Sequence, residues 1–388
     1  MASLPLNRVF INPLKSRNSM YGFTIVPRKL EPQAKTEVDS ILNTTSEPIG
    51  DGVVKFPIKD LKELCKLSYL SQSAYRVLFY LGEFKFKNLK DLEEKAKEID
   101  FSEFVKPNKT FAVRCKHVTE VPSSREIEHL IGSHINGKVN LDKPDIPILA
   151  YICEDRCYIG VDFSGDLGRR EYRIFTHSSA MAGPVAFCLN VLAGFKKGDT
   201  LLDPFVGCGT IPIEAALHAS KFSVNHFQKD KFKFSKIIDG VDEDFLENLD
   251  KESKLPEKQT IFGYDHLLRH VTAAKKNAKI AGILKTVYIS KVSTEWLDAK
   301  FKKGQVDMIV TDPPQVSRQV NPKDAEKILD EFFYQCAYVL NKDGCVVLSL
   351  HSTDKVVEKA EKHNFKLELK QEYYQGKQKH FALKFKKS

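Results

Sequence analysis

The segment LLDPFVGCGTIPIEAAL, which begins at Leu201, contains the residues whose types and spacing say most about chemistry. Its pattern predicts a strand that ends at Asp203 and a helix that begins at Thr210. The turn between them carries Gly207 and Gly209, where the backbone can approach a ligand that a Cβ would block. The N–H groups at the helix start favour a phosphate or a carboxylate. Because the segment lacks the spacings of phosphate-binding loops, we expect a carboxylate-bearing ligand.

A second acidic residue, Asp265, ends the strand-like segment IFGYD. In open parallel sheets, ligands bind beyond the carboxyl ends of the strands, near the point where the strand order reverses. An acidic side chain at that place can accept both hydrogens of a ribose diol. Together with the glycine turn, Asp265 points to S-adenosylmethionine, which carries a carboxylate on its methionine half and a ribose on its nucleoside half.

The strand-like segment VDMIVT runs into Asp312, Pro313 and Pro314. Two consecutive prolines fix the backbone and remove two N–H donors, so that carbonyl groups and the Asp312 side chain remain as acceptors. Such acceptors suit the exocyclic NH2 group of a nucleobase, because hydrogen bonds to Asp312 and to the Pro313 carbonyl would aim the amine at a methyl group. We expect positioning, rather than strong base catalysis, to supply most of the acceleration.

Strand-like and helical segments alternate after about residue 177, which predicts a parallel sheet with helices on both faces. Asn321 is a suitable N-cap, and Pro322 suits the first turn of the helix that follows. The last two alternating segments, FKLELKQEYY and HFALKFK, predict an antiparallel pair appended to the parallel sheet. We expect the lysine-rich stretch 221–260 to be a solvated surface insertion.

The first half of the chain mixes strand-like and helical segments and shows no catalytic constellation. FTIVP, TFAVRCK, IPILAYIC and RCYIGVDF predict strands, whereas PQAKTEVDSILN, residues 58–70 and PSSREIEHLIGSHI predict helices. Arg114 and Lys116 share one face of TFAVRCK. Three arginines lie close together in the segment GDLGRREYR, namely Arg169, Arg170 and Arg173.

Composition sets broad limits on the class of protein. The formal net charge of +9 is compatible with binding to a polyanion without establishing it. The sequence has no run of eighteen apolar residues and no apolar run of a secretory signal at its start, so we expect a soluble, cytoplasmic protein. Its eight cysteines include no Cys-x-x-Cys pair, so we expect reduced thiols and no metal site, at Cys153 and Cys157 included.

The glycine turn and Asp312-Pro313-Pro314 resemble the Rossmann-like methyltransferases that modify amines, whose motif is Asp/Asn-Pro-Pro followed by an aromatic residue. The segment HSSAMAGPVAFCLNVLAG is similar to the helix that completes their cofactor pocket, and TFAVRCK, SSREIEHLIG, VNLDKPD and SGDLGRREYR resemble the RNA-binding THUMP domain. In that order, these parts resemble the THUMP-containing tRNA guanine-N2 methyltransferases of archaea and their bacterial relatives, over nearly the whole chain.

The resemblance implies an α/β protein of three parts. These are a ferredoxin-like region over residues 1–60, which could extend to residue 105, a THUMP domain over residues 61–173, and a Rossmann-like methyltransferase domain over residues 174–388 with a mostly parallel seven-stranded sheet. The activity implied is S-adenosylmethionine-dependent formation of N2-methylguanosine in tRNA, with the THUMP domain gripping the acceptor end. We expect a monomer.

Individual residues have expected roles, some implied by the resemblance and some predicted from the residues themselves. The resemblance implies cofactor contacts from Ser178, Ala180, Asp203, Phe205, Gly207 and Asp265, and we also expect contacts from Gly209 and Thr210 at the glycine turn and from Ser293 at the third strand end. The expected catalytic residues are Asp312, Pro313, Pro314 and Gln315. The expected RNA phosphate contacts are Arg114, Lys116, Arg169, Arg170 and Arg173.

Two positions depart from the family pattern. Gln315 stands where the family has the aromatic residue that stacks on the flipped base. At the end of the third strand, Ser293 and Thr294 stand where a carboxylate usually recognises the adenine amine. These departures leave open a second hypothesis, a tRNA-binding protein on a methyltransferase scaffold that transfers methyl slowly or not at all. A third hypothesis, methylation of an amine in DNA, fits the THUMP-like half less well.

Overall fold

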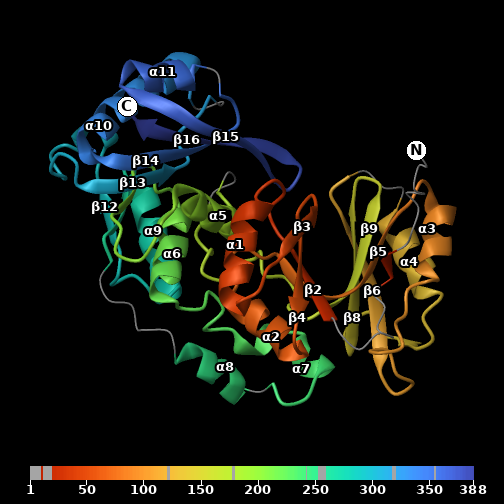
Figure 1. Ribbon diagram of the computed structural model, residues 1–388. Coiled ribbons are helices and arrows are strands. Elements are labelled where there is room, and N and C mark those ends of the chain that lie inside the picture. Colours follow the sequence, from red (N-terminus) through yellow and green to blue (C-terminus); the bar gives the residue numbers. More distant parts are fainter. Residues whose placement is uncertain are drawn as a thin grey trace. The chain divides into compact units, whose positions relative to one another are not determined.

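The structure is a computed structural model that describes residues 10–11, 20–119, 123–176, 180–241, 243–251, 259–316, 320–353 and 355–388. The chain divides into two compact units, each described below by itself (Figure 1). The first unit comprises Met1–Val26, Lys35–Leu167 and Gln228–Leu249. The second unit comprises Pro27–Ala34, Gly168–Phe227 and Asp250–Ser388.

Within the described residues, the first unit is built on one nine-stranded sheet with the order β3-β4-β2-β5-β9-β8-β6-β7, and β1 pairs with β5. Its strands are β1 (Phe10–Ile11), β2 (Met20–Ile25), β3 (Glu47–Gly50), β4 (Val53–Ile58), β5 (Arg76–Lys85), β6 (Thr110–His117), β7 (Lys138–Val139), β8 (Ile146–Cys153) and β9 (Arg156–Asp162). All four segments expected to be strands are therefore strands. The border expected near residue 60, between the ferredoxin-like region and the THUMP domain, falls between β4 and the next helix, inside this unit. The limits of the three expected domains therefore stay predictions.

Three helices of this half, α2, α3 and α4, begin after a residue whose side chain caps them. Asp60 accepts hydrogen bonds from two backbone N–H groups at the start of α2, and Ser123 accepts one at the start of α4. Ser123 lies in PSSREIEHLIGSHI, one of the segments expected to be helical. The helices are α1 (Glu31–Leu42), α2 (Leu61–Leu70), α3 (Leu89–Ala96) and α4 (Ser124–Gly132).

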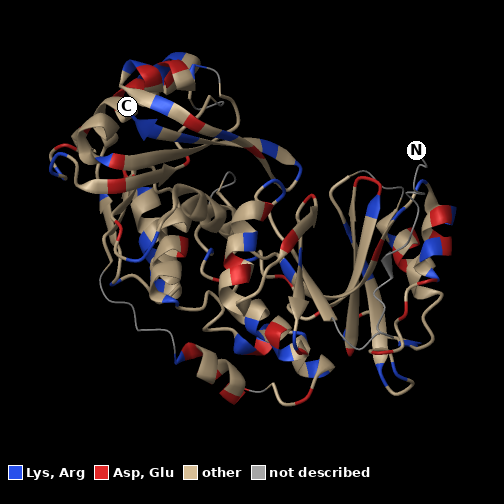
Figure 2. Cartoon of the chain, viewed as in Figure 1, with Lys and Arg blue, Asp and Glu red and all other residues tan. Residues whose placement is uncertain are grey.

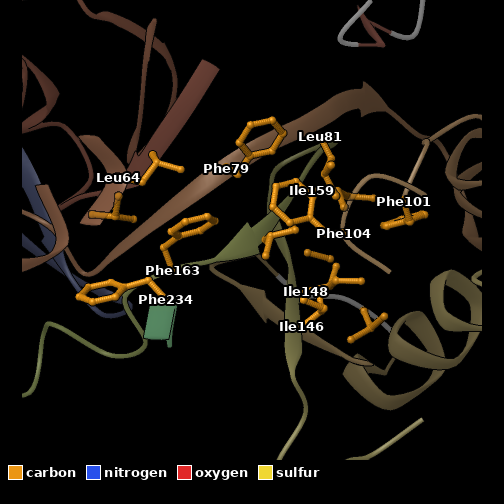
Figure 3. Close-up of a cluster of buried hydrophobic side chains, with 14 of the residues drawn as sticks. Leu64, Phe79, Leu81, Phe101, Phe104, Ile146, Ile148, Ile159, Phe163 and Phe234 are labelled. Carbon is orange, nitrogen blue, oxygen red and sulfur yellow. The ribbon is translucent and has the colours of Figure 1, made fainter. Parts of the chain in front are cut away.

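The stretch 221–260 was expected to be a solvated surface insertion. For its middle part this expectation was wrong, because residues there are buried in the core of the first unit. Residues 228–249 belong to the first unit and include η1 (Lys229–Lys231), α7 (Phe234–Ile237) and α8 (Glu243–Asp250). Phe232 and Phe234 are buried in its core, where Phe234 lies beside Phe163 (Figure 3). The Phe234 N–H also donates to the Phe163 carbonyl at 2.9 Å. Apolar side chains among the lysines drive this burial, which charge content alone does not reveal.

Within the described residues, the second unit contains a seven-stranded sheet with the order β12-β11-β10-β13-β14-β16-β15. The first five strands are parallel to one another, whereas β16 is antiparallel to both β14 and β15. The parallel sheet and the appended antiparallel pair are both as expected. The strands are β10 (Leu201–Asp203), β11 (Ile261–Asp265), β12 (Tyr288–Lys291), β13 (Val306–Thr311), β14 (Leu340–Leu350), β15 (Phe365–Gln375) and β16 (Gln378–Lys387).

Both faces of this sheet are buried. Successive strand residues point to opposite faces, and Leu201 and Leu202 accordingly join two different clusters of buried side chains. One cluster contains residues of α5 (Gly183–Ala193), α6 (Thr210–Ser220) and α9 (Leu268–Ile280). The other contains residues of α10 (Pro322–Val339) and α11 (Val356–Lys362), and η2 (Thr294–Trp296) follows β12. Asn321 caps α10 as expected, with Pro322 in its first turn.

Charged residues are distributed over both units. Figure 2 shows Lys and Arg interspersed with Asp and Glu, and several lysines lie on the β15–β16 hairpin. Two of these, Lys379 and Lys384, form ion pairs with Glu372 and Glu368. Among the described residues, no helix is long and apolar enough to cross a membrane, and no group of three or more potential ligands is placed to hold a metal ion.

Candidate active site

The carboxyl ends of β10 and β13 lie next to each other where the strand order reverses. From β10 the chain adds β11 and β12 on one side, and then returns to add β13 and β14 on the other. Ligands of open α/β sheets bind at such a point. The two strand ends are joined directly, because the Thr311 hydroxyl donates to Asp203 Oδ1 at 2.6 Å.

Three carboxylates converge at this edge. Asp203 is 1% exposed and also accepts a hydrogen bond from the Phe205 N–H at 3.2 Å. Burial raises the pKa of Asp203 to about 7, and the negative charges of Asp265 and Asp312 contribute to the rise. No Lys or Arg in the described part of the chain forms an ion pair with Asp203 or Asp312. The edge therefore repels further anions and favours a positively charged ligand.

The glycine turn has the backbone geometry that the sequence predicts. Gly207 and Gly209 have φ angles of 50° and 88°, which side-chain-bearing residues rarely adopt. A Cβ at Gly209 would also lie 3.0 Å from the Cβ of Ala274. Among the described residues, no side chain caps the start of helix α6 at Thr210. Its first N–H groups therefore suit a carboxylate.

Asp265 ties the glycine turn to the neighbouring strand end. Its Oδ2 accepts from the Gly207 N–H at 3.2 Å and contacts His270 Nδ1 at 3.0 Å, and its Oδ1 accepts from the Leu267 N–H at 2.9 Å. The Asp265 carbonyl accepts from the Val292 N–H at 3.1 Å, which brings the half-buried Ser293 next to this strand end. The structure thus groups Asp203, Gly207, Asp265 and Ser293, although their sequence positions span 90 residues.

The Asp-Pro-Pro segment also lies at this edge. Asp312 is half-buried, and its Oδ1 accepts from the Ser349 hydroxyl at 3.3 Å and from Gln315 Nε2 at 3.2 Å. Burial raises the pKa of Asp312 to about 7, although these two hydrogen bonds favour the charged form. A carboxyl group with this pKa can accept hydrogen bonds and a proton near neutral pH.

The segment before α5 is described only in part. Ser178 lies outside the described residues. The carbonyl of Ala180 accepts a hydrogen bond from Arg173 Nη2 at 3.1 Å. Arg173 is half-buried, so it supports this segment in addition to any contact with RNA.

The expectation that Arg170 contacts RNA was wrong. Its side chain is 1% exposed and forms an ion pair with the fully buried Glu214, with Nε to Oε1 at 2.8 Å. The Tyr172 hydroxyl donates to the same oxygen at 2.7 Å, and Gly183 packs so closely that a Cβ there would lie 2.5 Å from Arg170 Nε. A buried carboxylate is costly unless a cation is paired with it, and the ion pair with Glu214 on α6 accounts for the burial of Arg170. Arg169, by contrast, is exposed.

The other two expected RNA contacts lie in the first unit. Arg114 and Lys116 are exposed on β6. Arg114 is not a free cation, because its Nη2 donates to the Leu141 carbonyl at 2.5 Å and its Nη1 lies 3.7 Å from Glu128 Oε2. RNA contact by either residue stays a prediction.

Sequence reasoning missed several residues that organise this edge. Asn277 is fully buried, and its side chain bonds to the backbone of Phe175 and to the carbonyl of Cys208 in the glycine turn. A signal was present, because Asn277 falls on the buried face of α9 with Ala274 and Ala278. Ser349 and its neighbours gave no such signal, since only the pairing of β14 with β13 brings them to Asp312.

A surface depression of about 440 Å³ lies along α9 and is lined by Phe175, Leu268, Arg269, Thr272, Ala273 and Lys276. It includes none of the three carboxylates. We assign the chemistry to the carboxylate edge, because the depression offers cations and apolar side chains but no group that could accept a proton.

Comparison with known proteins identifies both halves. Residues 170–380 match the RMKL-like methyltransferase domain, and residues 86–162 match the THUMP domain. The chain is 30% identical to the tRNA (guanine(6)-N2)-methyltransferase of Methanocaldococcus jannaschii, over 91% of this chain and 95% of that protein. It is 28% identical to the protein of the same name from Archaeoglobus fulgidus, over 73% of this chain and 70% of that one.

Solved structures show the same fold. SMU.472, a putative methyltransferase complexed with SAH, superimposes with a TM-score of 0.77 at 19% identity, over 95% of this chain and 98% of that one. A possible methylase from Clostridium difficile 630 gives a TM-score of 0.79 at 20% identity, over 96% and 99%. The fold class expected from the sequence is thereby confirmed. The chain belongs to the family of S-adenosylmethionine-dependent RNA methyltransferases that join a THUMP domain to an RMKL-like methyltransferase domain.

Proposed function

We propose that this chain methylates the N2 amine of a guanosine in tRNA, with S-adenosylmethionine as the donor. The observation that carries the proposal is the half-buried Asp312 at the strand-order reversal, with a pKa raised to about 7 and no cation paired to it among the described residues. The choice of guanosine and of tRNA is supported by the names of the archaeal relatives.

The residues at the edge suit the donor. The start of α6 offers N–H groups without a side-chain cap for the methionine carboxylate, and Asp265 offers oxygens for the ribose diol. The convergent carboxylates of Asp203, Asp265 and Asp312 would stabilise the positive sulfonium. When bound, S-adenosylmethionine supplies an electrophilic methyl group.

Asp312 and Pro313 orient the target amine. The lone pair of N2 is delocalised into the guanine ring, so the amine is a poor nucleophile until it is positioned. Hydrogen bonds from the NH2 group to the Asp312 carboxylate and the Pro313 carbonyl would turn the lone pair toward the methyl group. The N–CH3 bond would form as the S–CH3 bond of the donor breaks, which leaves a neutral thioether. The amine would lose a proton in this step, and Asp312 can accept it because its pKa lies near neutrality.

RNA docking is assigned to exposed basic residues. Arg114 and Lys116 of the first unit and Arg169 of the second are exposed and can reach phosphate groups. The THUMP match over residues 86–162 includes β6, which carries Arg114 and Lys116. We propose that this half binds the acceptor end of tRNA.

The proposal is tested with purified protein, tritiated S-adenosylmethionine and total tRNA. We expect label in tRNA that appears as N2-methylguanosine after nucleoside mass spectrometry, and no label with Asp312→Ala. The matched control is Asp343→Ala, because Asp343 is exposed in β14 near its other end and should leave the rate unchanged. If the protein binds S-adenosylmethionine by calorimetry but labels no tRNA, the scaffold hypothesis replaces this one. Label in duplex DNA instead of tRNA would favour the DNA hypothesis.

A further inference from the structure

Gln315 is committed to contacts within the protein. Its Nε2 donates to Asp312 Oδ1 at 3.2 Å, and its Oε1 accepts from the backbone N–H of His351 at 2.5 Å. The same Nε2 lies 3.5 Å from the Ser349 carbonyl. Both ends of the amide are therefore occupied, and the side chain connects the Asp-Pro-Pro segment to the end of β14. Gln315 in this position orients Asp312 and does not offer a flat surface to a base.

A column of three rings stands at the same end of β14. Tyr373 lies on β15, His380 lies on β16, and His351 directly follows β14; β16 pairs with both β14 and β15 (Figure 1). The ring centroids of His351 and His380 are 4.2 Å apart, and those of His380 and Tyr373 are 5.2 Å apart with an interplanar angle of 20°. Tyr373 and His380 are buried, whereas His351 is exposed.

His380 serves as a flat support within this column. It is 6% exposed, and neither of its ring nitrogens has a hydrogen-bond partner in the described part of the chain. Burial lowers the pKa of His380 to about 4, with a further contribution from His351, so the ring is neutral at physiological pH. A neutral ring without polar partners contributes by packing against the rings on either side.

The column is also connected to the amine acceptor. The Tyr373 hydroxyl lies 2.9 Å from the Ser349 hydroxyl, which donates to Asp312 Oδ1 at 3.3 Å. His351 and Asp312 are thus connected by two routes: through Gln315, which accepts from the His351 backbone N–H, and through Ser349, Tyr373 and the ring of His380. The exposed imidazole of His351 is a ring surface at the same strand end as the carboxyl group of Asp312.

We propose that the imidazole of His351 is the stacking platform for the target base, in place of the aromatic residue that the family carries after Asp-Pro-Pro. This inference rests on the proposed function, since it names the side chain that holds the base at the same site. Base stacking on aromatic side chains, histidine included, is the usual way in which unpaired bases are held. Gln315 replaces the aromatic residue on which the base stacks in the family, after β13. With His351 as the platform, the stacking surface is instead at the end of β14, so the enzyme can hold a base without an aromatic residue at position 315.

The experiment compares His351→Ala, His351→Phe and the wild type in steady-state methylation of tRNA. We expect His351→Ala to raise KM for tRNA roughly tenfold with a smaller change in kcat, the size of one lost base stack. His351→Phe should restore KM to within about twofold, because a flat ring is what the site requires. The affinity for S-adenosylmethionine, measured by calorimetry, should be the same for all three proteins.

Tyr334→Ala is the matched control, because Tyr334 is an exposed ring on α10 of the same unit and is placed in no binding role. An unchanged KM for His351→Ala would overturn the inference, and so would a loss that Phe fails to restore, since the imidazole would then act by its nitrogens. If the wild type itself labels no tRNA while binding S-adenosylmethionine, the proposed function fails first. In that case His351→Ala is compared with the wild type for tRNA affinity alone, and equal affinities would overturn the inference as well.

Discussion

Two acidic groups with raised pKa values, one in each unit, have different hydrogen-bond surroundings. In the first unit, Glu37 is buried and accepts hydrogen bonds from both serine hydroxyls and two backbone N–H groups of residues 71–73. In the second unit, Asp312 at the carboxyl edge of the sheet accepts only two side-chain donors in the described part of the chain. Burial raises the pKa of both groups.

The two groups differ in how many of their oxygen acceptor sites are still unoccupied by hydrogen bonds within the protein; we call Asp312 the open acid for this reason. Glu37 is buried, and both of its oxygens accept hydrogen bonds from donors supplied by its own fold. Glu214 is a second closed case, because Arg170 and Tyr172 occupy its oxygens. The charge of Asp312 raises the pKa of Asp203, and neither carboxyl group is paired with a cation among the described residues. Under the proposed function, their remaining acceptor capacity serves the substrate and the cofactor. A raised pKa therefore marks a functional acid only when the hydrogen bonds around it are incomplete.

The largest expected effect is on the open acid. Asp312→Ala should lower kcat for tRNA methylation about a thousandfold, because it removes the side-chain oxygens that position the amine and accept its proton. Its melting temperature should stay close to that of the wild type. Glu37→Gln should do the reverse, with unchanged kcat per folded molecule and a free energy of unfolding lower by about 1–3 kcal/mol. Calorimetric melting and single-turnover rates measure both, and a loss of stability in Asp312→Ala as large as that in Glu37→Gln would break the comparison.

The closed pair in the second unit should matter only for stability. Arg170→Leu leaves the carboxylate of Glu214 buried without its cation, which should reduce the free energy of unfolding by about 3–5 kcal/mol. The neighbouring Arg169→Leu is the control, and because Arg169 is exposed we expect a change below about 0.5 kcal/mol. Urea unfolding of the two variants measures this difference. Equal stabilities would show that Arg170 is not the buried partner described here.

The pH dependence of the reaction should follow the open acid. The pKa of Asp312 is raised to about 7, so its charged, proton-accepting form predominates above that pH and is lost as the pH falls. We expect kcat/KM to rise about tenfold between pH 6 and pH 8. Glu37→Gln should show the same profile as the wild type, since Glu37 takes no part in the reaction. A profile that is flat over this range would contradict the assignment of Asp312 as the proton acceptor.

The smallest expected effect concerns RNA phosphate contacts. Arg169→Ala should weaken tRNA binding a few-fold and reduce the slope of log affinity against log salt by about one. Lys197→Ala is a suitable control, because Lys197 is exposed near the amino end of β10, at the opposite edge of the sheet from the carboxylates. Filter binding at several salt concentrations provides the measurement. A salt slope equal to that of the wild type would remove Arg169 from the contact surface.

Much of the second unit could be predicted from its sequence. The strands β10 to β16, the helix start at Thr210 and the cap at Asn321 are all encoded by neighbouring residues, through periodicity, glycine and proline. The alternation of strands and helices also implied that the carboxyl ends of β10, β11 and β13 share one edge, which is how Asp203, Asp265 and Asp312 could be grouped in advance.

Only the tertiary structure decided which side chains are paired or buried within the protein. Arg169 and Arg170 are adjacent and chemically identical in sequence, but only Arg170 lies opposite Glu214, 44 residues away. In the sequence, Gln315 appeared only as the loss of an aromatic stacking residue. Its hydrogen bond with the backbone N–H of His351 depends on the pairing of β13 with β14. From the sequence, Phe234 was placed in a charged surface insertion, but in the structure it packs in the hydrophobic core of the first unit. Periodicity and caps are local properties of the chain, whereas the partner of a buried charge or amide is chosen by packing between distant segments, and no single segment carries that information.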